Sequence, residues 1–164
     1  MNSDYIYEEK IFAKVIGGLL GGISVIMLII LLYQITVSPL GDDPTPTIFF
    51  LIMFIIFIIL TLMFSRLIIR ISFQSITVGF GIIKKRIPLE NIENCEIDKT
   101  SAIRYGGAGI RTARVKGEWV LVYNVVGGAR CVLKLKEGRF KKFVFSTKNP
   151  EEIVNIVKGQ LALG

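Results

Sequence analysis

The residue types that could do chemistry in this chain are basic side chains beside a glycine-rich segment. Residues 104–111 begin and end with arginine and contain three glycines. Backbone N–H groups exposed at those glycines could contact a phosphate while Arg104 and Arg111 clamp it. The segment is not a P-loop, because the Gly-Lys-Ser/Thr ending and its strand-to-helix context are missing. The alternative is a wide turn in which glycine supplies positive φ and the arginines are solvated.

A second basic cluster precedes this segment and enlarges the candidate site. Lys84, Lys85 and Arg86 are consecutive, and Arg70 stands shortly before them. Together with the two arginines of the glycine-rich segment, these residues are expected to bind an anion or an anionic lipid headgroup. Near an acidic membrane surface, each basic residue contributes on the order of 1 kcal/mol of attraction.

Other reactive groups are scarce, which favours binding over catalysis. The chain has no histidine, and its two cysteines, Cys95 and Cys131, stand far apart in the sequence. The commonest general base, the commonest metal ligand and any Cys-x-x-Cys motif are therefore missing. We expect no catalytic residues, no metal site and no cofactor. In a reducing compartment both thiols would stay free and pack as small apolar side chains.

The basic charge is concentrated in the later part of the chain. The whole sequence carries 20 Lys and Arg against 13 Asp and Glu, and residues 71–164 carry 16 against 8, a net charge of +8. Such a charge could neutralise nucleic-acid phosphates. However, the aromatic residues are spaced as core positions rather than as a stacking platform for bases: Trp119, Tyr123, Phe143 and Phe145. We therefore expect no nucleic-acid partner.

Two long uncharged runs at the start of the chain would hold this basic part at a membrane. Residues 15–41 and 44–65 form runs of 27 and 22 residues, separated only by Asp42 and Asp43. Because a bilayer core requires about 20 apolar residues, both runs are predicted to be transmembrane helices. A soluble protein of this length would lack the polar surface to cover them. The predicted division is a membrane hairpin in residues 1–70 and one β domain in residues 71–164.

The distribution of Lys and Arg predicts the orientation of this hairpin. None lies between Lys14 and Arg66, and the connecting residues 38–46 are acidic and rich in proline. The positive-inside rule then leaves both termini and the β domain in the cytoplasm, with the protein spanning the cell membrane twice. A cleaved signal peptide is disfavoured, because the first run exceeds the ~7–15 apolar residues of such signals and follows an acidic segment.

The first predicted helix carries two pairs of glycines, each pair spaced four residues apart. The pairs are Gly17 with Gly21 and Gly18 with Gly22. Small residues at this spacing let another helix backbone approach closely. The favoured partner is the second helix of the same hairpin, since an intramolecular neighbour is always present. A homodimer is the alternative.

After the hairpin the pattern changes to short β-branched and aromatic runs punctuated by glycine turns. This spacing predicts an antiparallel seven-strand sandwich or barrel, with strands at residues 72–78, 82–87, 91–98, 110–115, 119–125, 131–135 and 140–147. A C-terminal helix is expected from Pro150, because Asn149 can cap it and Glu151 and Glu152 suit its positive end. Its apolar stripe would cover an open end of the sandwich.

This layout and two segments within it resemble the pleckstrin-homology-like domains of bacterial membrane proteins. Residues 82–97 are similar to that family's basic strand, which is followed by an Ile-Pro-Leu sequence and spaced apolar residues. Residues 146–152 are similar to the segment that leads to the family's last helix. In that family a transmembrane hairpin directly precedes the domain. The resemblance implies a mostly-β domain with one C-terminal helix, and its motifs are structural rather than functional.

These features favour a membrane-anchored, non-catalytic binding or scaffold module. Its basic domain would engage a partner protein or anionic phospholipid at the inner membrane surface. The alternative is an accessory subunit, assembled into a membrane complex through the hairpin and through oligomerisation of the domain. Nucleic-acid binding by the basic domain is a further alternative, which the placement of the aromatic residues disfavours.

Overall fold

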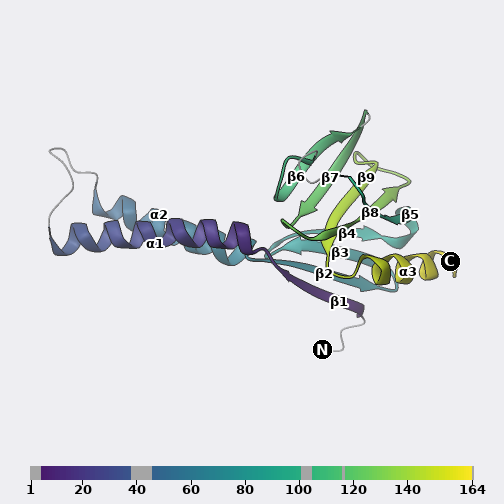
Figure 1. Cartoon of the computed structure of the whole chain (residues 1–164), viewed down its shortest axis with the longest axis horizontal. Coiled ribbons are helices and arrows are strands. Elements are labelled where there is room, and N and C mark those ends of the chain that lie inside the picture. Colours follow the sequence, from purple (N-terminus) through teal and green to yellow (C-terminus); the bar gives the residue numbers. More distant parts are fainter. Residues whose placement is uncertain (1–4, 38–45, 101–104, 116, 164) are drawn as a thin grey trace.

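The computed structural model describes residues 5–37, 46–100, 105–115 and 117–163, which form an α-helical hairpin and a two-sheet β-sandwich. The hairpin extends from one end of the sandwich, and the C-terminal helix packs beside the sheets (Figure 1). In chain order the elements are β1 (Tyr5–Phe12), α1 (Lys14–Thr36), α2 (Thr47–Phe64), β2 (Arg66–Ser72), β3 (Ser75–Phe80), β4 (Ile83–Pro88), the 3₁₀ turn η1 (Leu89–Asn91), β5 (Ile92–Ile97), β6 (Gly109–Val115), β7 (Glu118–Asn124), β8 (Ala129–Leu135), β9 (Lys142–Thr147) and α3 (Pro150–Leu161).

The two predicted apolar helices are present and pack against each other. Helices α1 and α2 contain 23 and 18 residues, and both are long and apolar enough to cross a membrane. A Cβ on Gly17 would lie 3.6 Å from the Cα of Ser65, and a Cβ on Gly21 would lie 3.8 Å from Cγ2 of Thr61. One turn farther along, the hydroxyls of Ser24 and Thr61 are 3.5 Å apart. Small residues therefore bring this side of α1 close to α2.

Two strands that the sequence pattern did not predict flank the hairpin and pair with each other. Strands β1 and β2 are antiparallel, and their register ends with Phe12 opposite Arg66. The backbone N–H of Ala13 then donates a hydrogen bond to the carbonyl of Ser65 at 2.8 Å. The helical hairpin is thus inserted between two paired strands, and the first sheet contains chain from both sides of it.

The described residues form nine strands instead of the expected seven, and they lie in two sheets. The first sheet has the order β1-β2-β3-β4 and the second has the order β5-β8-β9-β7-β6. Strand β9 turns back from β8 and inserts beside β7, so it runs parallel to β7. The expectation of a wholly antiparallel arrangement is therefore wrong at this pair. The two sheets form a sandwich and do not close into a barrel.

The apolar faces of the two sheets form one core with the C-terminal helix, which confirms the predicted α3. The helix begins at Pro150 as expected, but the side chain of Asn149 makes no capping hydrogen bond. Fully buried side chains come from both sheets and from α3, and include Leu67, Ile69, Val78, Leu133 and Ile153. A line of aromatic rings crosses this core from the end of α2. Successive centroids are 5.7, 6.2, 5.3 and 5.8 Å apart along Phe64, Phe80, Tyr123, Phe143 and Phe145.

One buried carboxylate joins β1 to the segment that leads into α3. Glu9 is 7% exposed, and its Oε2 accepts hydrogen bonds from the hydroxyls of Tyr7 at 3.0 Å and Thr147 at 2.6 Å. Its Oε1 accepts the backbone N–H of Lys148 at 2.7 Å. A buried carboxylate is costly unless donors replace its water. These three donors do so, and they tie the two ends of the described chain together.

The pairing of β1 with β2 predicts that the β part folds without its helices when both strands are kept. Replacing residues 14–64 by Asn-Gly would join Ala13 to Ser65 through a two-residue turn suited to antiparallel strands. We expect this variant to be soluble without detergent and to unfold cooperatively when heated, as followed by circular dichroism. A fragment of residues 71–164 lacks β1 and most of β2, and should show no cooperative transition. Cooperative unfolding of that fragment would contradict this interpretation.

The contacts of Glu9 predict an unequal effect of two neighbouring substitutions. Glu9→Gln places an amide N–H group against hydrogen-bond donors and should lower the free energy of unfolding by about 1–3 kcal/mol. Glu8→Gln removes only exposed ion pairs and should cost about 0–1 kcal/mol. Thermal unfolding of both full-length variants in the same detergent measures the difference. Equal losses would show that the buried carboxylate does not hold β1 in place.

Candidate functional site

Strand alternation gathers basic side chains on the outer face of the first sheet. Alternate residues of β2 are buried in the core, so Arg66 and Arg70 lie on the opposite face. The register places Arg70 opposite Thr77 of β3, and Thr77 opposite Arg86 of β4. In the next set of paired residues on this face, which lies closer to the hairpin, the residue from β4 is Lys84. We call the basic residues on this side the basic sheet face: Lys10, Arg66, Arg70, Lys84 and Arg86.

A glycine on the neighbouring strand allows the start of β4, with Lys84, to lie close to β3. A Cβ at Gly79 would lie only 2.6 Å from both Cα and Cγ of Lys84, and 2.5 Å from the carbonyl oxygen of Ile83. The backbone of β4, together with the start of the lysine side chain, therefore occupies the space that a larger residue at position 79 would need. Lys84 is exposed, and no hydrogen bond or ion pair holds its ammonium group within the described part of the chain. Its charge is available to a partner.

The other members of the basic sheet face are partly paired. Glu8 lies 3.3 Å from Nε of Arg70 and 3.0 Å from Nζ of Lys10. The hydrogen bond from Lys10, followed by that from Arg70, lowers the pKa of Glu8, so this carboxylate stays ionised and offsets part of the charge. Arg86 donates from Nε to the hydroxyl of Ser75 at 2.9 Å.

The basic sheet face begins where the helical hairpin ends. The guanidinium carbon of Arg66 lies 5.0 Å from the ring centroid of Phe12, which is 56% exposed. The turn between β3 and β4 meets the last turn of α2, since a Cβ at Gly81 would lie 3.1 Å from the Cα of Met63. The next residue, Ile82, is 81% exposed. Exposed apolar side chains thus lie at the base of the hairpin, and basic side chains follow directly.

The remaining predicted site residues do not join this face. Lys85 lies between two members of the face in sequence, but it lines a cavity between β4 and the second sheet. Arg111 belongs to β6 in the second sheet, and its Nε donates to the carbonyl of Ala108 at 3.3 Å. Arg104 lies outside the described residues. The anion clamp proposed for the glycine-rich segment stays a prediction.

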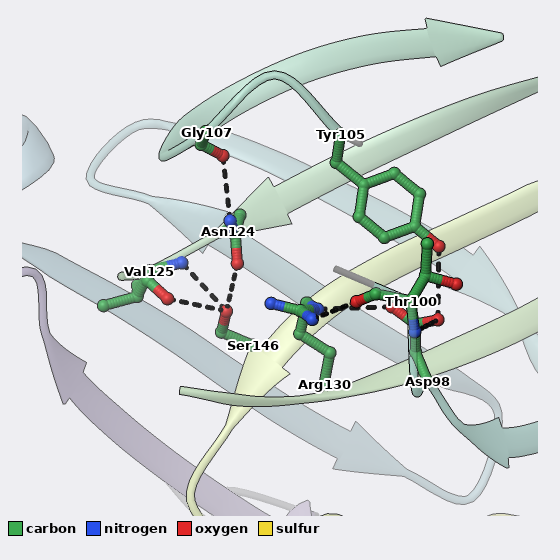
Figure 2. A network of polar contacts seen from close by, with 8 residues as sticks. All are labelled: Asp98, Thr100, Tyr105, Gly107, Asn124, Val125, Arg130 and Ser146. Carbon is green, nitrogen blue, oxygen red and sulfur yellow. Dashed lines mark hydrogen bonds and ion pairs between the residues drawn. The ribbon is translucent and has the colours of Figure 1, made fainter. Parts of the chain in front are cut away.

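A polar network anchors the glycine-rich segment to the second sheet (Figure 2). Tyr105 donates its hydroxyl to Oδ1 of Asp98 at 3.2 Å, and Nε of Arg130 lies 3.2 Å from Oδ2 of the same carboxylate. From the other side, Nδ2 of Asn124 donates to the carbonyl of Gly107 at 2.8 Å. Burial is the main cause that raises the pKa of Tyr105, so its hydroxyl stays a neutral donor.

The same network continues into the sheet and leaves its buried polar groups satisfied. Ser146 donates its hydroxyl to Oδ1 of Asn124 at 2.9 Å and accepts the backbone N–H of Val125 at 2.8 Å. Figure 2 shows these contacts beside the ion pair. The glycines of the segment have positive φ values of 81°, 93° and 91° at residues 106, 107 and 109. These features are typical of a braced turn, in which glycine supplies a backbone conformation that other residues rarely adopt.

The described residues offer little for redox or metal chemistry. No group of three or more His, Cys, Asp or Glu among them is arranged to hold a metal ion. Cys95 and Cys131 are buried free thiols. The hydrogen-bonding interaction with Cys95, and then burial, raise the pKa of Cys131, so its thiol stays protonated. A protonated buried thiol is a poor nucleophile, and both cysteines serve as core side chains.

Two members of the basic sheet face, Lys10 and Arg66, were not among the predicted site residues, and Arg66 served only to predict the orientation of the hairpin. Their place on the face follows from strands β1 and β2, which the sequence pattern did not predict. A signal for β2 was present, because alternate residues from Arg66 to Ile71 separate two basic side chains from three buried apolar ones. This signal is hard to recognise in the sequence, because Leu67, Ile68 and Ile69 continue the apolar run of the preceding helix.

Comparisons with known proteins do not assign this chain to a family. No family model matches the sequence, and neither the curated proteins nor the solved structures contain a match to it. The interpretation of the site therefore rests on the geometry of the chain itself: a basic sheet face that adjoins an apolar hairpin, and a separate cavity behind the edge strand β4.

The geometry of the glycine-rich segment predicts that its backbone matters more to stability than its arginine. Gly107 has open space around it, so Gly107→Val would cost only the strain of placing an L-residue at positive φ, about 1–2 kcal/mol. Arg111→Lys should change stability by less than about 0.5 kcal/mol, as exposed substitutions usually do. Thermal unfolding in detergent compares the two. A larger loss for Arg111→Lys would contradict the braced-turn interpretation.

Proposed function

We propose that this chain is a membrane-anchored, non-catalytic binding module whose basic sheet face engages anionic phospholipid at the inner surface of the cytoplasmic membrane. The observation that carries the proposal is the continuity of that face with the helical hairpin. Arg66 follows α2 directly, and the exposed Ile82 lies in the turn that touches the end of the same helix. A bilayer around the hairpin would therefore meet apolar side chains first and basic ones next, as interfacial anchors require.

Strand geometry supports a graded attraction along the face. Residues that pair across the strands form rows, which can be counted along β2 from Arg66 at the end of the hairpin. The row that contains Lys84 lies two residues from Arg66, and the row that contains Arg86 lies two residues farther. At a rise of about 3.3 Å per residue these rows lie about 7 and 13 Å from the end of the hairpin. The Debye length at physiological ionic strength is about 8 Å. Arg66 and Lys84 should therefore contribute most, and Arg86 less.

The proposed orientation places both termini and the sandwich in the cytoplasm. Lys14 and Arg66 flank the hairpin on the side of the sandwich, whereas the connection between the helices carries Asp42 and Asp43. Positive residues beside a span stay on the cytoplasmic side. The inner leaflet is also where anionic lipids attract juxtamembrane basic residues. Orientation and lipid binding thus support each other.

Kinship with bacterial pleckstrin-homology-like domains also stays a proposal. A mostly-β sandwich that follows two apolar helices and ends in one helix supports it. Strand β1, which precedes the hairpin and joins the first sheet, is an addition to the layout inferred from the resemblance. A partner protein could use the same basic surface, since acidic side chains and lipid phosphates present similar charge.

A second candidate function, an accessory subunit of a membrane complex, is favoured by one observation. Gly18 and Gly22 lie on the exposed side of α1, and a Cβ at either position would have no described atom within 4 Å. The glycine pair that faces α2 is Gly17 with Gly21, so this second pair is left for another helix. A second copy of this chain or a different membrane protein could supply that helix.

The lipid proposal predicts that the β3–β4 turn contacts lipid and that the lipid is preferentially anionic. Ile82→Trp in a Trp119→Phe background gives a single tryptophan fluorophore at this turn. In vesicles with a fixed minor fraction of brominated lipid, the fluorescence of the Ile82→Trp variant should be quenched more by brominated anionic lipid than by brominated neutral lipid. High salt should reduce the difference, because the attraction is screened.

Matched variants separate this effect from general charge loss. Arg66→Gln with Lys84→Gln should abolish the preference for anionic lipid, whereas Lys136→Gln with Lys158→Gln, on exposed positions elsewhere, should preserve it. Phe73→Trp in the same Trp119→Phe background reports on the opposite end of β3, about 20 Å away, and should not be quenched. Equal quenching of the Ile82→Trp variant by both lipids, or quenching of the Phe73→Trp variant, would contradict the proposal.

A further inference from the structure

A cavity of about 240 Å³ lies between the edge strand β4 and the connection from β8 to β9. Leu121, Leu135 and Phe143 line it from three strands of the second sheet. Each of these side chains is at most 9% exposed and belongs to the core between the sheets. The cavity therefore opens directly onto apolar interior, and a ligand in it would extend the core.

The rim of this cavity is cationic and lacks ion pairs. Lys85 and Arg86 contribute from β4, and Arg139 contributes from the β8–β9 connection. None of the three forms an ion pair within the part of the chain that the structure describes. The guanidinium of Arg139 instead lies 6.0 Å from the ring centroid of Trp119 and 5.6 Å from that of Phe140. Aromatic contacts hold this cation in place without neutralising it.

One side of the rim is fixed by an amide. Asn91 accepts the backbone N–H of Glu137 through Oδ1 at 2.9 Å and donates from Nδ2 to the carbonyl of Glu137 at 3.3 Å. Its own carbonyl accepts the N–H of Lys136 at 3.0 Å. These contacts connect η1 to the β8–β9 connection and hold the rim before any ligand arrives. Glu137 is the acidic residue that lines the cavity, and it opposes binding of an anion.

We propose that this cavity binds a small organic acid, with its carboxylate against Lys85 and Arg139 and its apolar body on Leu121, Leu135 and Phe143. Charge-assisted hydrogen bonds from the rim would select the anion, and the apolar floor would select its tail. At about 30 Å³ per water-sized group, the volume of about 240 Å³ encloses about eight non-hydrogen atoms, which is enough for a small apolar body whose carboxylate lies outside it at the rim. It is below the ~300–1,000 Å³ that drug-sized ligands occupy, so a two-chain phospholipid does not fit.

This site is distinct from the basic sheet face except at Arg86, which borders both. Lys84 lies on the outer face over Gly79, whereas Lys85 lines the cavity. Failure of one proposal therefore leaves the other standing, and the two lysines serve as each other's control. Trp119, the single tryptophan of the chain, lies beside Arg139 and reports on the rim.

The test is a titration of phenylacetate into the full chain in nanodiscs of neutral lipid. We expect saturable changes in Trp119 fluorescence and in the methyl resonances of Leu121 and Leu135. Phenylacetamide, which keeps the shape without the charge, should bind about tenfold more weakly, a loss of about 1.4 kcal/mol. Acetate, which lacks the apolar body, should leave the leucine methyl groups unchanged. Equal binding of acetate and phenylacetate would overturn the proposal, because any cationic surface would then suffice.

Single substitutions on the rim should change phenylacetate binding in opposite directions, which a general loss of structure would not do. Lys85→Gln and Arg139→Gln should each weaken phenylacetate binding about threefold to tenfold, as expected for charge-assisted contacts at a partly exposed rim. Glu137→Gln should tighten binding, because it removes repulsion. Lys84→Gln should leave binding unchanged. Absence of saturable binding to the unmodified chain, or equal weakening by Lys84→Gln and Lys85→Gln, would overturn the proposal.

Discussion

The pairing of β1 with β2 at the base of the helical hairpin is the constraint on which the rest of this structure depends. The hydrogen bond from Ala13 to Ser65 closes a ladder of strands that the two helices interrupt. Because those strands are part of the first sheet, the helices cannot tilt freely against the sandwich as they could on a flexible linker. The line of aromatic rings from Phe64 into the core adds a second rigid connection. A surface at the end of the hairpin is thereby held at a defined distance from any membrane the hairpin spans.

Alternation along the strands then sorts the charges onto separate surfaces. Consecutive residues of a strand point to opposite faces, so the run Lys84, Lys85 and Arg86 does not act as one cluster. Lys84 lies over Gly79 on the outer face, and Lys85 lines a cavity on the other side of β4. Arg86 borders both the cavity and the outer face. A basic run in the sequence is therefore divided between two surfaces in the folded chain.

The sequence identified those parts of the fold whose signals are local. Uncharged runs marked α1 and α2, and the sequence from Asn149 to Glu152 marked the start of α3. Strand β1 lacked such a signal, because its buried Glu9 is explained only by donors about 140 residues away in the chain. The parallel pairing of β7 with β9 likewise depends on where β9 inserts. The sequence analysis found basic residues of the site, but their division between two surfaces could be seen only from the pairing register of the strands.

Basic residues on an edge strand have a simpler explanation, since charge there prevents strands of other molecules from adding to the sheet. That explanation covers β4, which lies at one edge of the first sheet. It does not cover Arg66 and Arg70, because β2 is an interior strand paired on both sides. Gly79 does not separate the two explanations, because a Cβ there would meet backbone atoms of Ile83 and Lys84 that any residue at position 84 would have. Protection of an edge would not need basic residues on an interior strand, whereas a surface that meets anionic headgroups beside the hairpin would use them.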